Sequence, residues 1–185
     1  MLITLEPKRA MKFTVNVRIP GWALGKPVPS DLYRYADTAP ASSVAAAGVT
    51  IKVNGQDFSR GPMLKGFLPI TRKWKPGDRI ELDLPMPVRR VLAHENVKAD
   101  RGRFAIERGP LVYCAEGADN GGRVLDKVFP GKVRFEVQQK PDLLGGVVTV
   151  KMFAADGGAE LTCIPYYAWC HRGPNEMCVW FPVGP

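Results

Sequence analysis

RFAIERGPLVYCAE, residues 103–116, is the stretch that decides the expected fold. Side chains 104–107 alternate between two faces, as successive side chains of an extended strand do. Residues 111–114 form a second, continuous apolar run. Gly109 and Pro110 stand between the two runs, where glycine takes a positive φ at little cost and proline fixes its own φ. The stretch therefore predicts two β-strands that meet at a turn, and the turn contains no nucleophile.

Similar patterns extend from this stretch in both directions. Residues 12–19, 79–84 and 132–137 alternate between apolar and polar side chains, and residues 49–53 lead into Asn54-Gly55, a strong hairpin signal. Gly 19 and Pro 17 make up about a fifth of the 185 residues, and helix signals are almost absent.

This pattern of many short strands separated by turns predicts an all-β protein. We expect two tandem antiparallel β-sandwich domains of jelly-roll-like form, residues 1–99 and a smaller one at residues 100–185. Residues 24–48 contain prolines and an Ala/Ser-rich patch without a sustained period, so we expect a long surface insertion there.

The net charge of +8, from 26 Lys and Arg against 18 Asp and Glu, raises the question of nucleic-acid binding. The basic residues are scattered singly or in pairs such as Arg89-Arg90, with carboxylates between them. Neither a recognition helix nor a basic stripe with interleaved aromatics is apparent. We therefore expect a solvated basic surface and no nucleic-acid partner.

The apolar stretches are all well short of the roughly 18 residues that span a bilayer. The first residues, MLITLEPKRAMK, lack the basic start, apolar middle and cleavage site of a signal peptide. We expect a soluble chain with no membrane partner. The start directly in a strand-like run is typical of a segment cut from a longer protein, and the compartment stays open, a periplasmic or secreted parent being one option.

Four cysteines are present. Cys114 lies in an apolar run, which favours a buried thiol. Cys163, Cys170 and Cys178 follow the spacing C-x6-C-H-x6-C, whereas structural zinc sites use closely spaced pairs. We therefore predict no metal site, while a disulfide among the three stays open because pairing cannot be read from sequence.

No constellation of catalytic side chains is apparent. Glycoside hydrolysis needs two carboxylates across a cleft. Glu95, Glu107, Glu116 and Asp119 are available, but their spacing singles out no pair. The chain has only two histidines and no G-x-S-x-G motif. We therefore assign no catalytic residue.

The aromatic side chains are the best candidates for a contact site. Aromatic residues in strands more often fill the core than bind a ligand. Tyr166 and Tyr167 are adjacent, so in a strand one of them must face away from the core. We select Tyr166, Tyr167 and Trp169 as the candidate site for contact with a ligand or another domain.

Five motifs together resemble the C-terminal part of glycoside hydrolase family 127, the β-L-arabinofuranosidases and their relatives. They run in order over nearly the whole chain: FTVNVRIPGWA (13–23), IKVNGQ (51–56), ITRKWKPGDRIELDLPMPVRRV (70–91), RGRFAIERGPLVYCAEGADN (101–120) and IPYYAWCHRGPNEMCVWFP (164–182). Two departures stand out: Cys170-His171 replaces the Ala-Asn expected there, and segment 24–48 is longer than usual.

The resemblance implies that the catalytic unit is an (α/α)6 barrel preceding this region, with its zinc, cysteine nucleophile and glutamate in the barrel. None of those motifs stands in this chain, so no catalytic residue, metal ligand or cofactor is carried over. What remains are two β-sandwich domains, with a boundary near Ala99, that pack beside the parent barrel.

The expected function is a non-catalytic accessory region that braces or shapes the barrel of a parent glycoside hydrolase, while this segment alone is no enzyme. The alternative is a carbohydrate-binding module that uses exposed aromatics to bind plant-type, arabinose-containing glycans.

Overall fold

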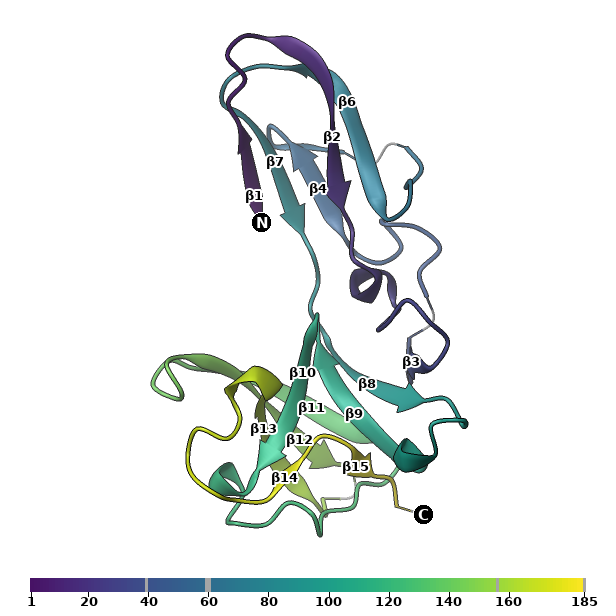
Figure 1. Ribbon diagram of the computed structural model, residues 1–185, viewed down its shortest axis with the longest axis vertical. Helices are drawn as coiled ribbons and strands as arrows, with labels where there is room; N and C mark the ends of the chain where they lie inside the picture. The colour runs from purple at the N-terminus through teal and green to yellow at the C-terminus, as the bar shows by residue number, and fades with distance from the viewer. Residues whose placement is uncertain (39, 59–60, 156, 185) are drawn as a thin grey trace. The chain divides into compact units, whose positions relative to one another are not determined.

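The computed structural model describes residues 1–38, 40–58, 61–155 and 157–184 (Figure 1). The chain forms two compact units, one of Met1–Pro29 with Ala39–Met86 and one of Ser30–Thr38 with Pro87–Pro185. Within the described residues the paired strands run antiparallel and the helical segments are short 3₁₀ turns. The all-β, antiparallel prediction is confirmed. No helix of this part of the chain is long and apolar enough to cross a membrane.

The first unit packs two sheets against each other. Its elements are β1 (Leu2–Leu5), β2 (Met11–Arg18), η1 (Gly21–Leu24), β4 (Thr50–Val53), β5 (Gln56–Asp57), β6 (Phe67–Trp74) and β7 (Asp78–Asp83). One sheet has the order β1-β7-β4-β5, and β2 pairs with β6 to form the other. Val53 pairs with Gln56, which confirms the predicted hairpin at Asn54-Gly55.

The core of the first unit is apolar and lies between its two sheets. Ile70 and Trp74 of β6 belong to the same buried cluster as Ile51 of β4 and Ile80 of β7. Trp74 is fully buried, and its indole N–H donates to the carbonyl oxygen of Phe13 at 3.1 Å. Because its one polar group is satisfied, this large ring can fill the core without a desolvation penalty.

The second unit is built on one large sheet. Its strands are β3 (Tyr33–Tyr35), β8 (Val88–Ala93), β9 (Arg103–Arg108), β10 (Leu111–Glu116), β11 (Val133–Lys140), β12 (Val147–Ala154), β13 (Glu160–Pro165), β14 (Met177–Cys178) and β15 (Phe181–Pro182), and its 3₁₀ turns are η2 (Lys98–Asp100), η3 (Gly117–Asp119) and η4 (Tyr166–Ala168). The main order is β11-β12-β13-β10-β9-β8-β3, with β14 on β10 and β15 on β9.

The contacts divide the chain between Met86 and Pro87, before the expected boundary near Ala99. The reason is that β8, which precedes Ala99, hydrogen-bonds to β9 in the sheet of the second unit, for example through the pair Arg89↔Glu107. A boundary near Ala99 would separate these two paired strands.

The stretch at residues 103–116 forms a hairpin that then opens. Arg108 pairs with Leu111 across the turn, where Gly109 supplies a φ of 61°. Figure 1 shows β9 and β10 diverging from this turn, with β14 and β15 in the space between them. Cys178 of β14 pairs with Ala115 of β10, and β15 pairs with the start of β9. The end of the chain therefore completes both arms of the opened hairpin.

Three aromatic rings fill the core beside this hairpin. Phe104, Phe129 and Phe181 are fully buried, with ring centroids 5.7 to 6.2 Å apart. The alternation predicted for residues 104–107 is confirmed, because Phe104 and Ile106 lie in this core whereas Ala105 lies in a separate buried cluster.

Segment 24–48, expected as a surface insertion without regular structure, is shared between the units. Tyr35 of β3 pairs with Val91 of β8 at the edge of the second sheet, whereas Val44 and Ala47 pack against the first core. Ala39 lies outside the described residues. A strand of three residues is too short to show a period, so β3 is not recognisable from residues 33–35 alone.

Candidate functional site

Tyr166, Tyr167 and Trp169 lie on one turn directly after β13. The segment is the 3₁₀ turn η4 and not a strand, so the alternation expected of a strand does not apply and both tyrosines are exposed, Tyr166 by 43% and Tyr167 by 64%. Ala168 is buried in their place. The rings of Tyr166 and Trp169 stack, with centroids 5.9 Å apart and planes 20° from parallel. We call residues 166–169 the aromatic turn.

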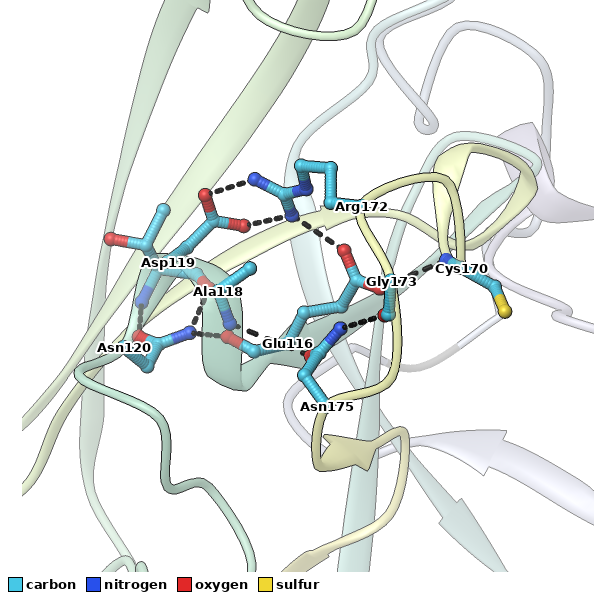
Figure 2. A network of polar contacts seen from close by, with 9 residues as sticks. Glu116, Ala118, Asp119, Asn120, Cys170, Arg172, Gly173 and Asn175 are labelled. Atoms are coloured by element: carbon cyan, nitrogen blue, oxygen red, sulfur yellow. Dashed lines mark hydrogen bonds and ion pairs between the residues drawn. The ribbon is translucent and has the colours of Figure 1, made fainter.

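A buried carboxylate holds the loop that follows the aromatic turn. Glu116, at the end of β10, is 1% exposed and accepts the N–H of Cys170 at 2.9 Å. Arg172 donates to Glu116 and also to both carboxylate oxygens of Asp119 in η3, with an Nη1 to Oδ1 distance of 2.6 Å (Figure 2). Two parallel hydrogen bonds between guanidinium and carboxylate fix geometry as well as charge. We call Glu116, Asp119 and Arg172 the clamp.

Two groups of the clamp, the Glu116 carboxylate and the Arg172 guanidinium, have pKa values shifted in favour of their charged forms. Burial by itself raises the pKa of Glu116, but the hydrogen bonds from Arg172 and from the Cys170 N–H outweigh it, and the pKa of Glu116 is lowered. Hydrogen bonding to Asp119 likewise raises the pKa of Arg172. Both carboxylates therefore accept hydrogen bonds from one guanidinium, and this holds the loop in place.

Two more polar side chains fasten the neighbouring backbone. The Asn120 amide donates to the carbonyl oxygens of Glu116 and Thr162 and accepts the N–H of Thr162 at 2.7 Å. Glu176 accepts the N–H groups of residues 124 and 125. Arg172 and Glu176 thus tie the loop between the aromatic turn and β14 to the residues that follow β10.

Another carboxylate, that of the partly buried Glu107, lies elsewhere on the sheet of the second unit. Glu107 of β9 accepts the hydroxyl of Tyr35 at 3.0 Å, and the guanidinium of Arg89 lies 4.8 Å from the centre of the Tyr35 ring. Burial raises the pKa of Glu107, against the lowering by Tyr35 and Arg89. Burial raises the pKa of both Glu107 and Glu116, but the net pKa shifts are opposite because the hydrogen bonds to Glu116 outweigh its burial.

All four cysteines are free thiols. Cys163 and Cys178 pair with Ala115 from its two sides, so about 10 Å separates their Cα atoms, too far for a disulfide. Burial, with the charges of Glu116 and Asp119, raises the pKa of Cys114 to about 12. Across the described ranges, no group of three or more His, Cys, Asp or Glu side chains could hold a metal ion.

The sequence offered Glu116 and Asp119 as available carboxylates but could not join them to Arg172. Their partner lies 56 and 53 residues further along the chain. The available signals were indirect: a polar, glycine-rich loop after β10 and one arginine between two turn residues. Glu95, the fourth available carboxylate, is exposed and is not part of the clamp.

Comparison with known proteins places both units in one family. Residues 1–86 match the model of the "Beta-L-arabinofuranosidase, GH127 middle domain", and residues 88–182 match that of the "Glycoside hydrolase family 127 C-terminal domain". The non-reducing end β-L-arabinofuranosidase of Bifidobacterium longum subsp. longum is 32% identical over 191 aligned positions, which cover 89% of this chain and 25% of that enzyme.

Solved structures give the same result. A GH127 β-arabinofuranosidase is 40% identical with a TM-score of 0.83, over 94% of this chain and 28% of that one. A GH127 β-L-arabinofuranosidase from Geobacillus stearothermophilus T6 is 32% identical with a TM-score of 0.79, over 99% of this chain and 28% of that one. This chain thus spans about a quarter of the length of these relatives, and it belongs to glycoside hydrolase family 127, in which it corresponds to the middle and C-terminal domains.

Proposed function

We propose that this chain is the non-catalytic accessory region of a β-L-arabinofuranosidase-like glycoside hydrolase, and that it braces or shapes a catalytic (α/α)6 barrel. One observation carries the proposal: the two units match the middle and C-terminal domains of family 127, while the chain covers only 25% of the Bifidobacterium enzyme. The zinc of this proposal belongs to the barrel. The cysteines do not fit a zinc site, since no group of three or more His, Cys, Asp or Glu side chains among the described residues could hold a metal ion.

The roles of the carboxylates support an accessory function. Glu116 and Asp119 are close together, but both bind Arg172, and Glu107 is hydrogen-bonded to Tyr35. A glycosidase instead needs one carboxyl group that gives up a proton and a second that faces it across a cleft. These side chains hold loops and strands together.

The aromatic turn is the proposed contact with the barrel. Tyr and Trp rings offer large contact areas at a low cost in side-chain entropy, and both are enriched at the energetic centres of interfaces. Tyr167 is 64% exposed and stands three residues before Cys170, whose N–H is bound by Glu116 of the clamp. Ordering this surface on binding therefore costs little.

A second candidate function rests on the same rings. The near-parallel stack of Tyr166 on Trp169, with Tyr167 exposed beside it, also suits a carbohydrate-binding module that stacks a sugar ring on an aromatic face. In that case arabinose-containing glycans are the ligands.

A chromogenic β-L-arabinofuranoside assay on the purified chain tests the accessory role, with a complete GH127 enzyme as the positive control. We expect no turnover, and clear hydrolysis by the purified chain contradicts the proposal.

Trp fluorescence during titration with arabinose-containing oligosaccharides tests the second candidate. Saturable change that is lost in Tyr167→Ala, and kept in Val137→Ala at another exposed apolar position, favours the binding module. No change leaves the rings as the contact with the barrel.

A further inference from the structure

The net positive charge is concentrated in the first unit. That unit holds 12 Lys and Arg against 5 Asp and Glu, whereas the second holds 14 against 13. A strong charge difference between two parts of a chain indicates an anionic partner for the basic part.

Part of this charge lies on the outward face of the sheet formed by β2 and β6. The cross-strand pairs on this face are Lys12↔Lys73, Thr14↔Thr71, Asn16↔Pro69 and Arg18↔Phe67. Seven of these eight side chains are exposed, Pro69 is partly so, and none is acidic. We call the eight residues the cationic face.

The cationic face carries charges that nothing on it neutralises. Lys12 lies directly opposite Lys73, and like charges in this position destabilise a sheet. Among the described residues, no ion pair involves Lys12, Lys73 or Arg18. On the other sheet of the same unit the arrangement is different, because Lys52 pairs with both Asp57 and Glu81. A repulsive pair of this kind is explained if an anionic ligand binds between the two ammonium groups.

The remaining groups on the face suit a sugar chain. The Thr14 and Thr71 hydroxyls lie 2.8 Å apart beside the lysine pair and can exchange hydrogen bonds with hydroxyl groups. At the other end the Arg18 guanidinium lies over the exposed Phe67 ring, 5.2 Å from its centre. From Lys12 to Arg18 the strand runs about 20 Å, which suits an extended polymer.

We propose that the cationic face binds an anionic polysaccharide, a chain of sugars that bear carboxylate groups. The inference rests on the proposed function, which makes this chain part of a glycan-processing protein. An acidic protein surface fits less well, because protein interfaces have an apolar centre and this face has only Phe67 and Pro69. The sequence alone showed scattered basic residues, since the strand pairing that unites them joins distant parts of the chain.

Fluorescence anisotropy with labelled oligogalacturonate at low ionic strength tests the proposal. We expect saturable binding that weakens steeply as salt is added. Lys12→Gln combined with Lys73→Gln should weaken binding by about tenfold or more, because it removes both charges at one end of the face. Since the double variant also removes a repulsive pair, it should be at least as stable as the parent chain, which separates lost binding from lost folding.

Lys52→Gln is the matched control, a lysine on the other sheet of the same unit, and it should keep the affinity. Neutral arabinan oligosaccharides should not compete. Absence of saturable binding, or equal affinity of the double variant, overturns the proposal. Equal binding of poly-dT through the same lysines also overturns it, in favour of nucleic acid. The outcome is independent of the arabinofuranoside assay, so hydrolysis by this chain refutes only the accessory role.

Discussion

The two units differ in what they bury. The core of the first unit consists of apolar side chains, with Trp74 as its largest member. Among the described residues, the polar side chains with full burial are Glu116 and Thr149, and both lie in the second unit. In the first unit, the inward faces of the two sheets are enough to exclude water from the core. The second must also hold an irregular loop, residues 166–176, whose backbone has no strand partner, and a buried carboxylate supplies the missing acceptor.

The units also differ in how they treat charge. The clamp of the second unit combines two carboxylates with one guanidinium. The cationic face of the first unit sets Lys12 against Lys73 with no acid on that face. Buried charge in the second unit therefore fixes the position of a loop, whereas the exposed charges of the cationic face make no ion pair among the described residues.

The largest expected effect is loss of the apolar core of the first unit. Trp74→Ala should lower the free energy of unfolding by about 3–5 kcal/mol, because it leaves a cavity and frees the carbonyl of Phe13. Trp169→Ala, at a partly exposed ring of the aromatic turn, should cost less than about 1 kcal/mol. Urea unfolding followed by circular dichroism measures both, and equal losses would contradict the assignment of Trp74 alone to a core.

Removal of the buried carboxylate should come next. Glu116→Ala leaves the Cys170 N–H without its acceptor and removes one of the three Arg172 hydrogen bonds in the clamp, at an expected cost of about 2–3 kcal/mol. Glu136→Ala is the control: its ion pair with Arg134 is exposed on β11, so the loss should be about 0–1 kcal/mol. If both variants lose the same free energy, burial of Glu116 does not matter to stability.

The pH dependence of stability should reveal the same carboxylate. The pKa of Glu116 is lower in the folded chain than the value of about 4.3 for an unfolded one. Its contribution is therefore fully present above about pH 4.3 and is lost as the pH falls through the folded pKa. Denaturation curves across this range should show a smaller acid-induced loss for Glu116→Gln than for the parent chain.

Glu107→Gln should behave in the opposite way. Burial raises the pKa of Glu107, so its charged form opposes folding at neutral pH. The variant keeps an acceptor for the Tyr35 hydroxyl and removes the charge, and it should be slightly more stable at pH 7. The advantage should vanish below about pH 4.3, where Glu107 is protonated in both states. A variant that is less stable at neutral pH would show that the contact with Arg89 outweighs burial.

Sequence reasoning succeeded where structure follows from local pattern. Period-two alternation located β2 and β9, and Asn54-Gly55 located a hairpin, because both signals need only a few neighbouring residues. It failed at Tyr166 and Tyr167, since two adjacent tyrosines suit a strand or a 3₁₀ turn, and the chain forms the turn η4 with Ala168 as its buried residue.

The clamp and the cationic face were beyond prediction for another reason. Arg172 meets Glu116 across 56 residues, and Lys12 meets Lys73 only because β2 pairs with β6 in one register. Such contacts are set by the arrangement of strands, which a single sequence does not specify. From the sequence, Glu116 and Asp119 could be noted as available carboxylates, but no role could be assigned to them.

The smallest effect concerns the strain that the clamp maintains in its loop. Cys170 has a φ of 68°, a left-handed conformation that costs a residue with a side chain about 1 kcal/mol. Cys170→Gly removes this cost, although glycine also gains freedom in the unfolded chain, so stability should rise by at most about 1 kcal/mol. Gly173→Ala is the reciprocal test, because Gly173 has a φ of 82° and open space around the added methyl group, so any loss reports the backbone alone. Thermal unfolding should move in opposite directions for the two variants, and a shift of the same sign in both would mean that the loop relaxes when either residue is changed and that the clamp does not fix its backbone.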